Sequence, residues 1–251
     1  MCPGFQHLER LPEEQRPPWH FTMTTTATTP NSASVATSVF QTIQEDIALG
    51  YLRPRERLPE EDLAARFNVK RHIIRAELQE LERFGLVRRV PNKGAVVTDY
   101  KPRDVKGLFE LRVLIETAAA ERIVYPADAD VVRHLRAIQL EHDQATRDNR
   151  MRQVLRLNDQ FHKTLFALCD NPYIVETIRY FQKKSYAVRF YSISAPQYLQ
   201  KARDDHWEMI RALEHAEKAT LVALCRHHLE QSCEAYAQAY ARMFPEFDVS
   251  E

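Results

Sequence analysis

Apolar residues recur at the three- and four-residue spacing of a helix face along most of this 251-residue chain, starting near Val35. The first such stripe is closed by Gly50, a residue typical of helix C-termini. A second helix is expected to start at the acidic run Glu60-Glu61-Asp62, because carboxylates stabilise the positive end of the helix dipole. The short Asn68-Val69 turn leads into a third helix, predicted from Lys70 to Leu81. Two short helices joined by so brief a turn predict a helix-turn-helix.

The pattern changes between residues 86 and 97. Leu86–Val90 and Ala95–Val97 are short runs typical of strands, and Pro91-Asn92-Lys93-Gly94 between them predicts a hairpin turn. A helix-turn-helix followed by a two-stranded ribbon is a winged helix. In such folds the start of the second helix of the motif enters the major groove of DNA. The basic residues at the start of this helix, which would meet base edges, are Lys70, Arg71 and Arg75.

Six longer amphipathic helices are predicted after residue 103, punctuated by Pro126, Pro172, Pro196 and Pro245. One of the six is expected to run from about Pro172 towards Phe190. Helices of this length with short joints form an antiparallel bundle. The fold predicted from the sequence is therefore mainly α, with a winged helix-turn-helix domain over residues 35–100, a linker over 101–103 and an all-helical domain over 104–245. Residues 1–34, rich in proline and threonine, are expected to form a disordered tail, in which Met23 is a candidate for the native start.

Charge and composition narrow the class of protein. Lys and Arg number 35 and Asp and Glu also number 35, so a nucleic-acid face must be local. Between Arg66 and Lys93, eight basic residues stand against three acidic ones, a net charge of +5 that suits contacts to phosphate. A membrane span is excluded, because no apolar run is long enough. Four cysteines without paired spacing favour a reducing compartment, and hence the cytoplasm.

Three histidines fall on the apolar stripes of three different predicted helices: His162, His206 and His228. Asn158 lies one turn before His162 on the same face. Three buried imidazoles converging in a bundle core are costly unless something binds them, and imidazole is a good ligand for transition metals. The sequence therefore predicts a metal site, with a set of hydrogen-bonded core histidines as the alternative. His142 also marks the stripe of its helix.

The N-terminal domain resembles the winged helix of the GntR family of bacterial transcription regulators. The resemblance rests on Leu63-Ala64-x-x-Phe67-x-Val69-x-Arg71, on Arg75-x-Glu77-Leu78-x-x-Leu81-x-x-x-Gly85-Leu86-Val87, and on Gly94. It implies that DNA is contacted by the start of the recognition helix and by the wing tip, hence by Lys70, Arg71, Arg75, Lys93 and Gly94. The sequence departs from the family pattern at Arg55, at Lys70 and at His72-Ile73, and the last two changes affect the base preference.

The C-terminal domain is similar to the FCD effector domain, on the residues Asn158-x-x-Phe161-His162, Asn171-Pro172, His206-x-x-x-Ile210 and His228-Leu229. Both halves together point to the FadR-type subgroup. The resemblance implies a divalent transition metal ion held by Asn158, His162, His206 and His228, with zinc expected and nickel, iron or manganese as alternatives. It also implies a small organic acid as effector. Asn158 stands where Asp is commoner, which removes a negative charge and should favour an anionic effector.

Other residues near these positions have weaker claims. Arg112, followed by Glu116 one turn on, matches the Arg-x-x-x-Glu of the family and is the candidate for binding the effector carboxylate; an intrahelical ion pair is an equal alternative. Tyr186, Arg189 and Tyr191 are further candidates for the pocket lining. Two competing metal ligands, Asp159 and His227, are out of phase with the stripes.

These observations predict a homodimeric transcription regulator, a repressor, that binds a palindromic operator and responds to a small carboxylate. It is expected to be located in the cytoplasm with the nucleoid and not to be an enzyme. Two alternatives stand beside this prediction. One is an enzyme that activates water at a three-histidine metal site, and the other is a regulator whose metal is purely structural.

Overall fold

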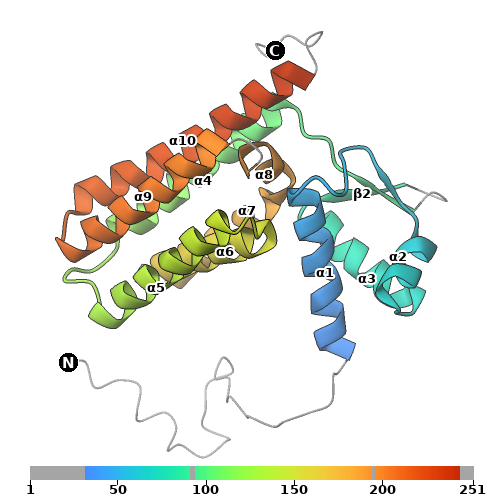
Figure 1. The fold of residues 1–251 in the computed structure, drawn as a ribbon, viewed down its shortest axis with the longest axis horizontal. Helices are drawn as coiled ribbons and strands as arrows, with labels where there is room; N and C mark the ends of the chain where they lie inside the picture. The colour runs from blue at the N-terminus through green and yellow to red at the C-terminus, as the bar shows by residue number, and fades with distance from the viewer. Residues whose placement is uncertain (1–31, 91–93, 194–195, 244–251) are drawn as a thin grey trace, which may run out of the picture. The chain divides into compact units, whose positions relative to one another are not determined.

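The computed structural model describes residues 32–90, 94–193 and 196–243. Within them the chain forms ten helices and three short strands (Figure 1). In chain order they are α1 (Ser32–Ala48), β1 (Arg57–Leu58), α2 (Glu60–Phe67), α3 (Arg71–Arg83), β2 (Val87–Val90), β3 (Gly94–Val97), α4 (Pro102–Glu121), α5 (Ala129–Arg147), α6 (Met151–Phe166), α7 (Pro172–Lys184), α8 (Tyr186–Ile193), α9 (Pro196–Glu214) and α10 (Lys218–Met243). The predicted fold class, a winged helix-turn-helix followed by a helical domain, is confirmed. Met23 and most of the predicted tail lie outside the described residues, and α1 begins at Ser32, before the predicted domain start.

The helix-turn-helix consists of α2 and α3. The turn between them is made possible by Asn68, which takes the left-handed backbone conformation at φ +51° and caps α2. Lys70 is extended and lies just before α3, so the recognition helix starts one residue later than predicted. Ile74, Leu78 and Leu81 of α3 are buried against α1 and α2, which leaves the start of the helix exposed.

The wing has one strand more than predicted. The sheet order is β1-β3-β2, with β3 antiparallel to both neighbours. β1 is only two residues long, too short for an alternation of polar and apolar residues to reveal it, but its Leu58 is buried in the core. Gly94 opens β3 at φ +76°, and a Cβ there would lie 2.9 Å from the Leu58 carbonyl oxygen. The close approach of β1 therefore requires glycine at this point of the wing.

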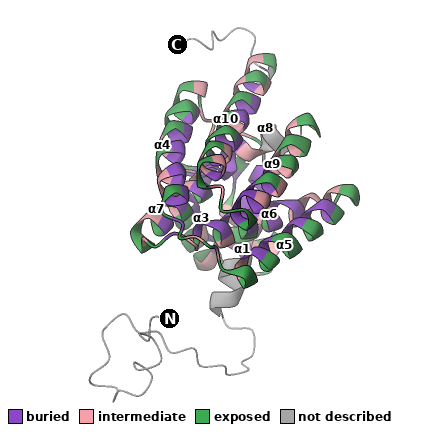
Figure 2. Cartoon of the chain, turned by 90° about the vertical axis from the view of Figure 1, so that its left-hand side faces the viewer, coloured by how far each residue is buried: buried purple, intermediate pink, exposed green. Residues whose placement is uncertain are grey.

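The helical domain is an antiparallel bundle in which α10 packs along α4 and α9, and α5 packs along α6 and α9. The bundle helices turn their buried residues inward and their exposed residues outward (Figure 2), and most of the buried residues are apolar. α4 begins at Pro102, within the predicted linker over 101–103. The bundle core includes Phe161, Leu165, Ile178 and Leu213, all at most 2% exposed.

The prediction of a single helix from Pro172 towards Phe190 is wrong. The structure has two helices there, α7 and α8, separated at Ser185. The Ser185 hydroxyl donates to the Phe181 carbonyl and accepts from Arg112 Nη1 at 3.2 Å. A serine that bonds to the preceding turn bends a helix. The break lets Val188 and Arg189 of α8 line the pocket described below.

Helix α6 also contacts the N-terminal domain. Its Leu155 belongs to the core of that domain. Two buried acids of α1, Glu45 and Asp46, pair with its Arg152 and Arg156, the latter at 2.6 Å between Nε and Glu45 Oε1. Asp46 also accepts from Arg66 at the end of α2 at 2.5 Å. The bundle is therefore attached to the winged-helix domain through buried carboxylates as well as through apolar packing.

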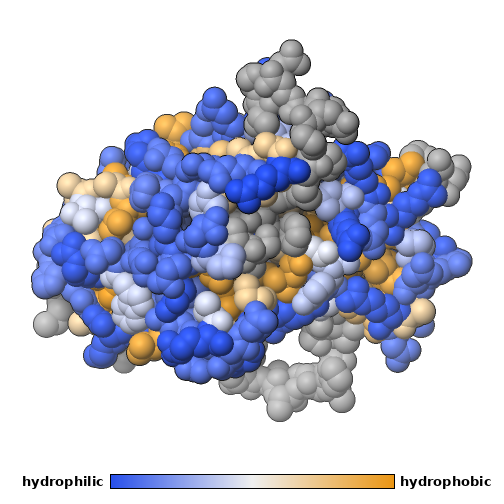
Figure 3. All heavy atoms as spheres, turned by 45° about the horizontal axis from the view of Figure 1, so that its top comes forward, coloured by the Kyte–Doolittle hydropathy of each residue, from blue (hydrophilic) through white to orange (hydrophobic). Residues whose placement is uncertain are grey.

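The face shown in Figure 3 is mostly hydrophilic, with apolar residues scattered in small groups. Among the described residues, no helix is long and apolar enough to cross a membrane.

Candidate metal and effector pocket and DNA-binding surface

Three helices of the bundle bring three histidines to one point. His162 of α6, His206 of α9 and His228 of α10 are all buried, and each offers a ring nitrogen within 4.8 Å of the other two. The Nε2 atoms of His162 and His206 lie 3.3 Å apart. The three histidines that the helical spacing places on apolar stripes therefore converge.

The outer ring nitrogens of two of these histidines are held by neighbouring side chains. His206 Nδ1 donates to Gln139 Oε1 at 2.8 Å, and His228 Nδ1 donates to Asp205 Oδ2 at 3.1 Å. Gln139 in turn donates to Asp143. Amide or carboxylate partners of this kind fix the tautomer of metal-ligating histidines and orient their rings. With Nδ1 of each ring engaged in this way, Nε2 is the ring nitrogen that remains to act as a ligand atom.

Burial determines the charge of the cluster. It lowers the pKa of His162 and of His206 well below the usual range, and the neighbouring imidazoles act in the same direction. Both rings are therefore neutral at physiological pH and carry a free lone pair. His162 Nδ1 is buried without a hydrogen-bond partner among the described residues. A donor set of three imidazoles fits zinc and other borderline divalent ions.

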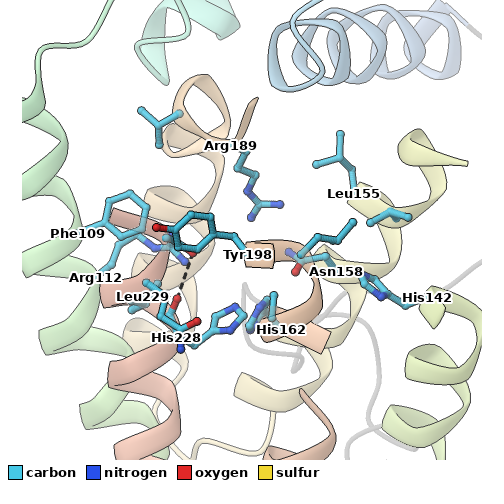
Figure 4. A pocket seen from close by; sticks show the side chains of 16 residues that line it. Phe109, Arg112, His142, Leu155, Asn158, His162, Arg189, Tyr198, His228 and Leu229 are labelled. Atoms are coloured by element: carbon cyan, nitrogen blue, oxygen red, sulfur yellow. Dashed lines mark hydrogen bonds between the residues drawn. The ribbon is translucent and has the colours of Figure 1, made fainter. Parts of the chain in front are cut away.

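A cavity of about 90 Å³ lies beside His162 and His228. Figure 4 shows Asn158 next to His162, with His142 of α5 beyond it on the same wall. Arg189 reaches into the cavity from α8, and Tyr198 of α9 lies between Arg189 and the histidines. The cavity is thus bounded by ring nitrogens on one side and by guanidinium groups on the other, an arrangement that can hold a small anion.

His142 was not among the predicted site residues. It lines the cavity, is 2% exposed, and its Nδ1 is buried without a hydrogen-bond partner among the described residues. Its ring meets that of His206 edge-on, at 5.8 Å between centroids. Burial lowers its pKa to about 4, so the ring is neutral. The sequence could have indicated this residue, because His142 lies on the apolar stripe of α5 just as His162 lies on the apolar stripe of α6.

Arg112 fits both descriptions given to it by the sequence. Its Nε donates to Glu116 Oε1 at 2.8 Å within α4, and both side chains are buried. It also lines the cavity, and its Nη1 donates a hydrogen bond to the hydroxyl of Ser185, between α7 and α8. The ion pair neutralises the guanidinium in the free protein and fixes its direction. A carboxylate in the cavity would meet a cation that is already oriented.

The remaining candidates separate clearly. Arg189 lines the cavity and pairs with Asp159 at 2.6 Å. Tyr186 instead packs in the core of the DNA-binding domain. His227 is exposed, unlike its neighbour His228. The side chain of Tyr191 lies outside the described residues.

The DNA-binding candidates gather at the exposed start of α3. Lys70, Arg71 and Arg75 are exposed, as a helix that inserts into a groove requires. Gly94 opens β3 opposite Val90, at the turn end of the wing hairpin, and Lys93 lies outside the described residues.

The two arginines predicted to contact DNA, Arg71 and Arg75, are paired with acids of α2. Arg75 forks onto Glu60, with Nε to Oε1 at 3.1 Å and Nη2 to Oε2 at 2.9 Å. Arg71 Nη1 donates to Glu61 Oε1 at 2.8 Å. Arg66, Arg83 and Arg89 also form ion pairs, with Asp46, Glu80 and Glu82. The surface is therefore less positive than the predicted +5, because that count omitted acids that precede the stretch in sequence.

Comparison with known families agrees with both halves of this structure. Residues 35–97 match the model of bacterial regulatory proteins of the gntR family, and residues 107–231 match the FCD domain. The chain belongs to the GntR family of transcriptional regulators and carries an FCD domain.

Two relatives are similar to this chain in sequence, and two solved structures share its fold. The chain is 27% identical to the Nta operon transcriptional regulator of Aminobacter aminovorans, over 76% of this chain and 83% of that protein. It is 25% identical to the HTH-type transcriptional repressor RspR of Escherichia coli K12, over 80% and 88%. A putative GntR regulator from Rhodococcus sp. RHA1 has the same fold, with a TM-score of 0.69 at 24% identity, over 82% and 99% of the two chains. Escherichia coli McbR/YncC superposes with a TM-score of 0.66 at 20% identity, over 86% and 99%.

Proposed function

We propose that this GntR-family regulator is a metabolite-responsive repressor whose helical domain binds a divalent transition metal ion and a small carboxylate. One observation carries the proposal: three buried imidazoles converge beside a cavity that two arginines also line. A core of histidines that served packing alone would leave His162 Nδ1 and His142 Nδ1 buried without partners and without benefit.

The ion would be held by His162, His206 and His228, with the Asn158 side-chain oxygen beside them. Zinc is the ion best matched to three imidazole nitrogens, and nickel, iron and manganese are the alternatives. When bound, it supplies a Lewis-acidic anchor for an anionic ligand. Asn158 contributes no charge, so the ion keeps more of its positive charge for the effector than it would beside an aspartate.

The effector is small. The cavity of about 90 Å³ is well below the roughly 150 Å³ of an engineered cavity that admits benzene. Arg112 and Arg189 favour a carboxylate, since guanidinium groups bind carboxylates through paired hydrogen bonds. His142 offers a neutral ring nitrogen for a second polar group of the same molecule. A short hydroxy acid or dicarboxylate satisfies these groups together.

Helix α6 is the element through which the cavity reaches the DNA-binding domain. It carries Asn158 and His162 at the cavity, and in its first two turns Arg152 and Arg156, which pair with the α1 acids Glu45 and Asp46. Leu155 touches both regions, since it lines the cavity and belongs to the N-terminal core. A ligand that shifts α6 would act on both attachments at once. DNA is contacted by Lys70, Arg71, Arg75, Lys93 and Gly94 from each half of a homodimer on a palindromic operator.

The proposal is tested by elemental analysis and native mass spectrometry of the purified protein, beside the His206→Ala variant. We expect about one transition-metal ion per chain in the wild type and loss of that ion in the variant. His227→Ala is the matched control, because His227 is exposed on the same helix as His228, and it should keep the metal. Full metal content in His206→Ala would contradict the ligand set.

The two alternatives give different outcomes in the same samples. A purely structural metal predicts that no small acid changes DNA affinity, whereas an enzyme predicts that the bound acid is consumed. Titration of the zinc-loaded protein with three- and four-carbon hydroxy acids and dicarboxylates, followed by DNA binding and by analysis of the acid, separates the three cases.

A further inference from the structure

The acids that face the recognition helix form an unusual feature of the DNA-binding surface. Glu60 and Glu61 lie in the first turn of α2, which is not the helix expected to enter the groove. Their carboxylates nevertheless reach the start of α3 and hold Arg71 and Arg75. As surface ion pairs they contribute little to folding. Their position at the predicted DNA contact gives them a different consequence.

The two acids hold the arginines in different ways. Glu60 is largely covered, with a side chain 17% exposed, and it grips the Nε–Nη2 edge of Arg75 with both oxygens. Such a fork fixes the plane of a guanidinium and leaves its Nη1 end pointing away from the acid. Glu61 is 72% exposed and makes a single hydrogen bond to Arg71. Glu60 therefore orients the Arg75 guanidinium, whereas Glu61 competes with DNA phosphate for Arg71.

We propose that Glu60 and Glu61 determine which DNA the recognition helix accepts: Glu60 orients Arg75 toward one guanine edge, and Glu61 restrains Arg71 from binding phosphate indiscriminately. A guanidinium reads guanine by donating two hydrogen bonds to O6 and N7, which demands a fixed plane. Phosphate makes no such demand. An arginine fixed in orientation therefore gains more at the matching base than at the backbone, and an acid beside it penalises sites where the arginine finds no better acceptor.

The second part follows from charge. A protein gains non-specific affinity for each phosphate that a free cation neutralises. Arg71 in contact with Glu61 must exchange one anion for another, so its gain at an arbitrary phosphate is small. Removing the charge of Glu61 should leave Arg71 with only its longer 3.8 Å ion pair to Glu60, and so make it more available for such contacts. The inference depends on the proposed DNA-contact roles of Arg71 and Arg75.

The test compares Glu60→Gln and Glu61→Gln with the wild-type full-length protein. The specific probe is the consensus duplex that the wild type selects from a random double-stranded library, and the non-specific probe is a scrambled duplex of the same length. Glu80→Gln is the matched control, because Glu80 pairs with Arg83 at the far end of α3 and its change adds the same charge. Dissociation constants are measured over a series of salt concentrations, and each variant repeats the selection.

We expect Glu60→Gln to bind the consensus about five- to tenfold more weakly and to lose the preference for guanine at one position of each half-site. Glu61→Gln should bind scrambled DNA several-fold more tightly, with a salt dependence steeper by about 0.9 for each new phosphate contact. Glu80→Gln should keep the wild-type ratio of consensus to scrambled affinity.

The inference is overturned if all three variants change both affinities equally, which is the effect of net charge alone, or if Glu60→Gln binds the consensus as tightly as the wild type with unchanged base preference. Far-ultraviolet circular dichroism and thermal midpoints confirm that the variants are folded. If the wild type selects no consensus, the proposed DNA-binding surface itself is wrong, an outcome distinct from failure of the acid residues.

Discussion

Two arginine–glutamate pairs of almost equal length lie in the two halves of this regulator and differ in nearly everything else. Arg112–Glu116 spans 2.8 Å at the cavity, with side chains 7% and 2% exposed. Arg75–Glu60 spans 2.9 Å at the start of the recognition helix, with Arg75 61% exposed. Water screens the second pair and not the first. Distance alone therefore says little about what an ion pair contributes, and burial decides it.

The difference matches the functions proposed for the two regions. At the cavity, Arg112 is held by the buried Glu116 and Arg189 by the partly exposed Asp159, so both guanidinium groups are oriented before the proposed ligand enters. The DNA-binding surface holds many charges in exposed pairs, which a polyanion can exchange at little cost. The same chemistry thus serves a rigid site in the bundle and an exchangeable one on α3.

The buried pair should show the largest effect on stability. Glu116→Gln leaves Arg112 charged, buried and without its ionised partner, and we expect the free energy of unfolding to fall by about 3–5 kcal/mol. Urea denaturation at pH 7 measures it. Glu82→Gln, which weakens an exposed pair with Arg89, is the control and should leave the midpoint almost unchanged. Equal effects of the two substitutions would contradict the role given to burial.

The exposed surface should show its largest effect in DNA binding. Arg71→Ala should weaken binding to the selected consensus duplex by roughly 10- to 100-fold at fixed salt, since a good base contact is worth about 1–3 kcal/mol. The denaturation midpoint should not change, because the side chain is exposed. Fluorescence anisotropy and a urea titration give both values. Unchanged DNA affinity would remove α3 from the groove.

These two regions also differ in how far the sequence predicts them. Helical phase placed His162, His206 and His228 on buried faces, and the structure brings them together, because burial follows periodicity. The same phase pointed to His142, whose part in the cavity depends on which face of α5 meets α9. The partners Gln139 and Asp205 have no sequence signal of their own, since any polar residue of suitable length could bond to an imidazole.

On the DNA-binding surface, the sequence predicts which basic residues are exposed but not which acidic residues form ion pairs with them. Arg75 and Glu60 are fifteen residues apart on separate helices, and no spacing rule connects them. The additional strand β1 and the break at Ser185 were also not predictable, since two residues show no alternation and the break depends on Arg112 from a distant helix.

The pH dependence of stability tests the neutral state of the buried rings. In the folded protein burial lowers the pKa of His142 to about 4, below the 6.5 of the unfolded chain. The unfolded state therefore takes up a proton first, so stability is complete above pH 6.5 and falls as the pH drops towards 4. His162 and His206 act in the same direction.

In metal-free protein, His142→Asn should reduce the slope of unfolding free energy against pH by about 1.4 kcal/mol per unit in this window. Urea titrations at pH 7, 6 and 5, with a chelator present, give the slope. His134→Asn is the control, because His134 is exposed on the same helix, and it should keep the wild-type slope. An unchanged slope in His142→Asn would mean that this ring is charged, or reached by water, in the folded state.

The attachment of α6 to α1 should show the smallest effect, because it changes a coupling between regions rather than either region itself. Arg156 is half-exposed, but its partner Glu45 is only 1% exposed and is also bound by Arg152. We expect Arg156→Ala to keep the metal and to reduce, by a few-fold, the change in consensus-DNA affinity caused by adding zinc to chelated protein; couplings of this kind are worth about 0.5–2 kcal/mol. Lys163→Ala, exposed on the same helix, should preserve the zinc effect. If Arg156→Ala responds to zinc as the wild type does, the buried carboxylates of α1 only join the domains, and any signal between cavity and DNA passes through the apolar contacts of Leu155.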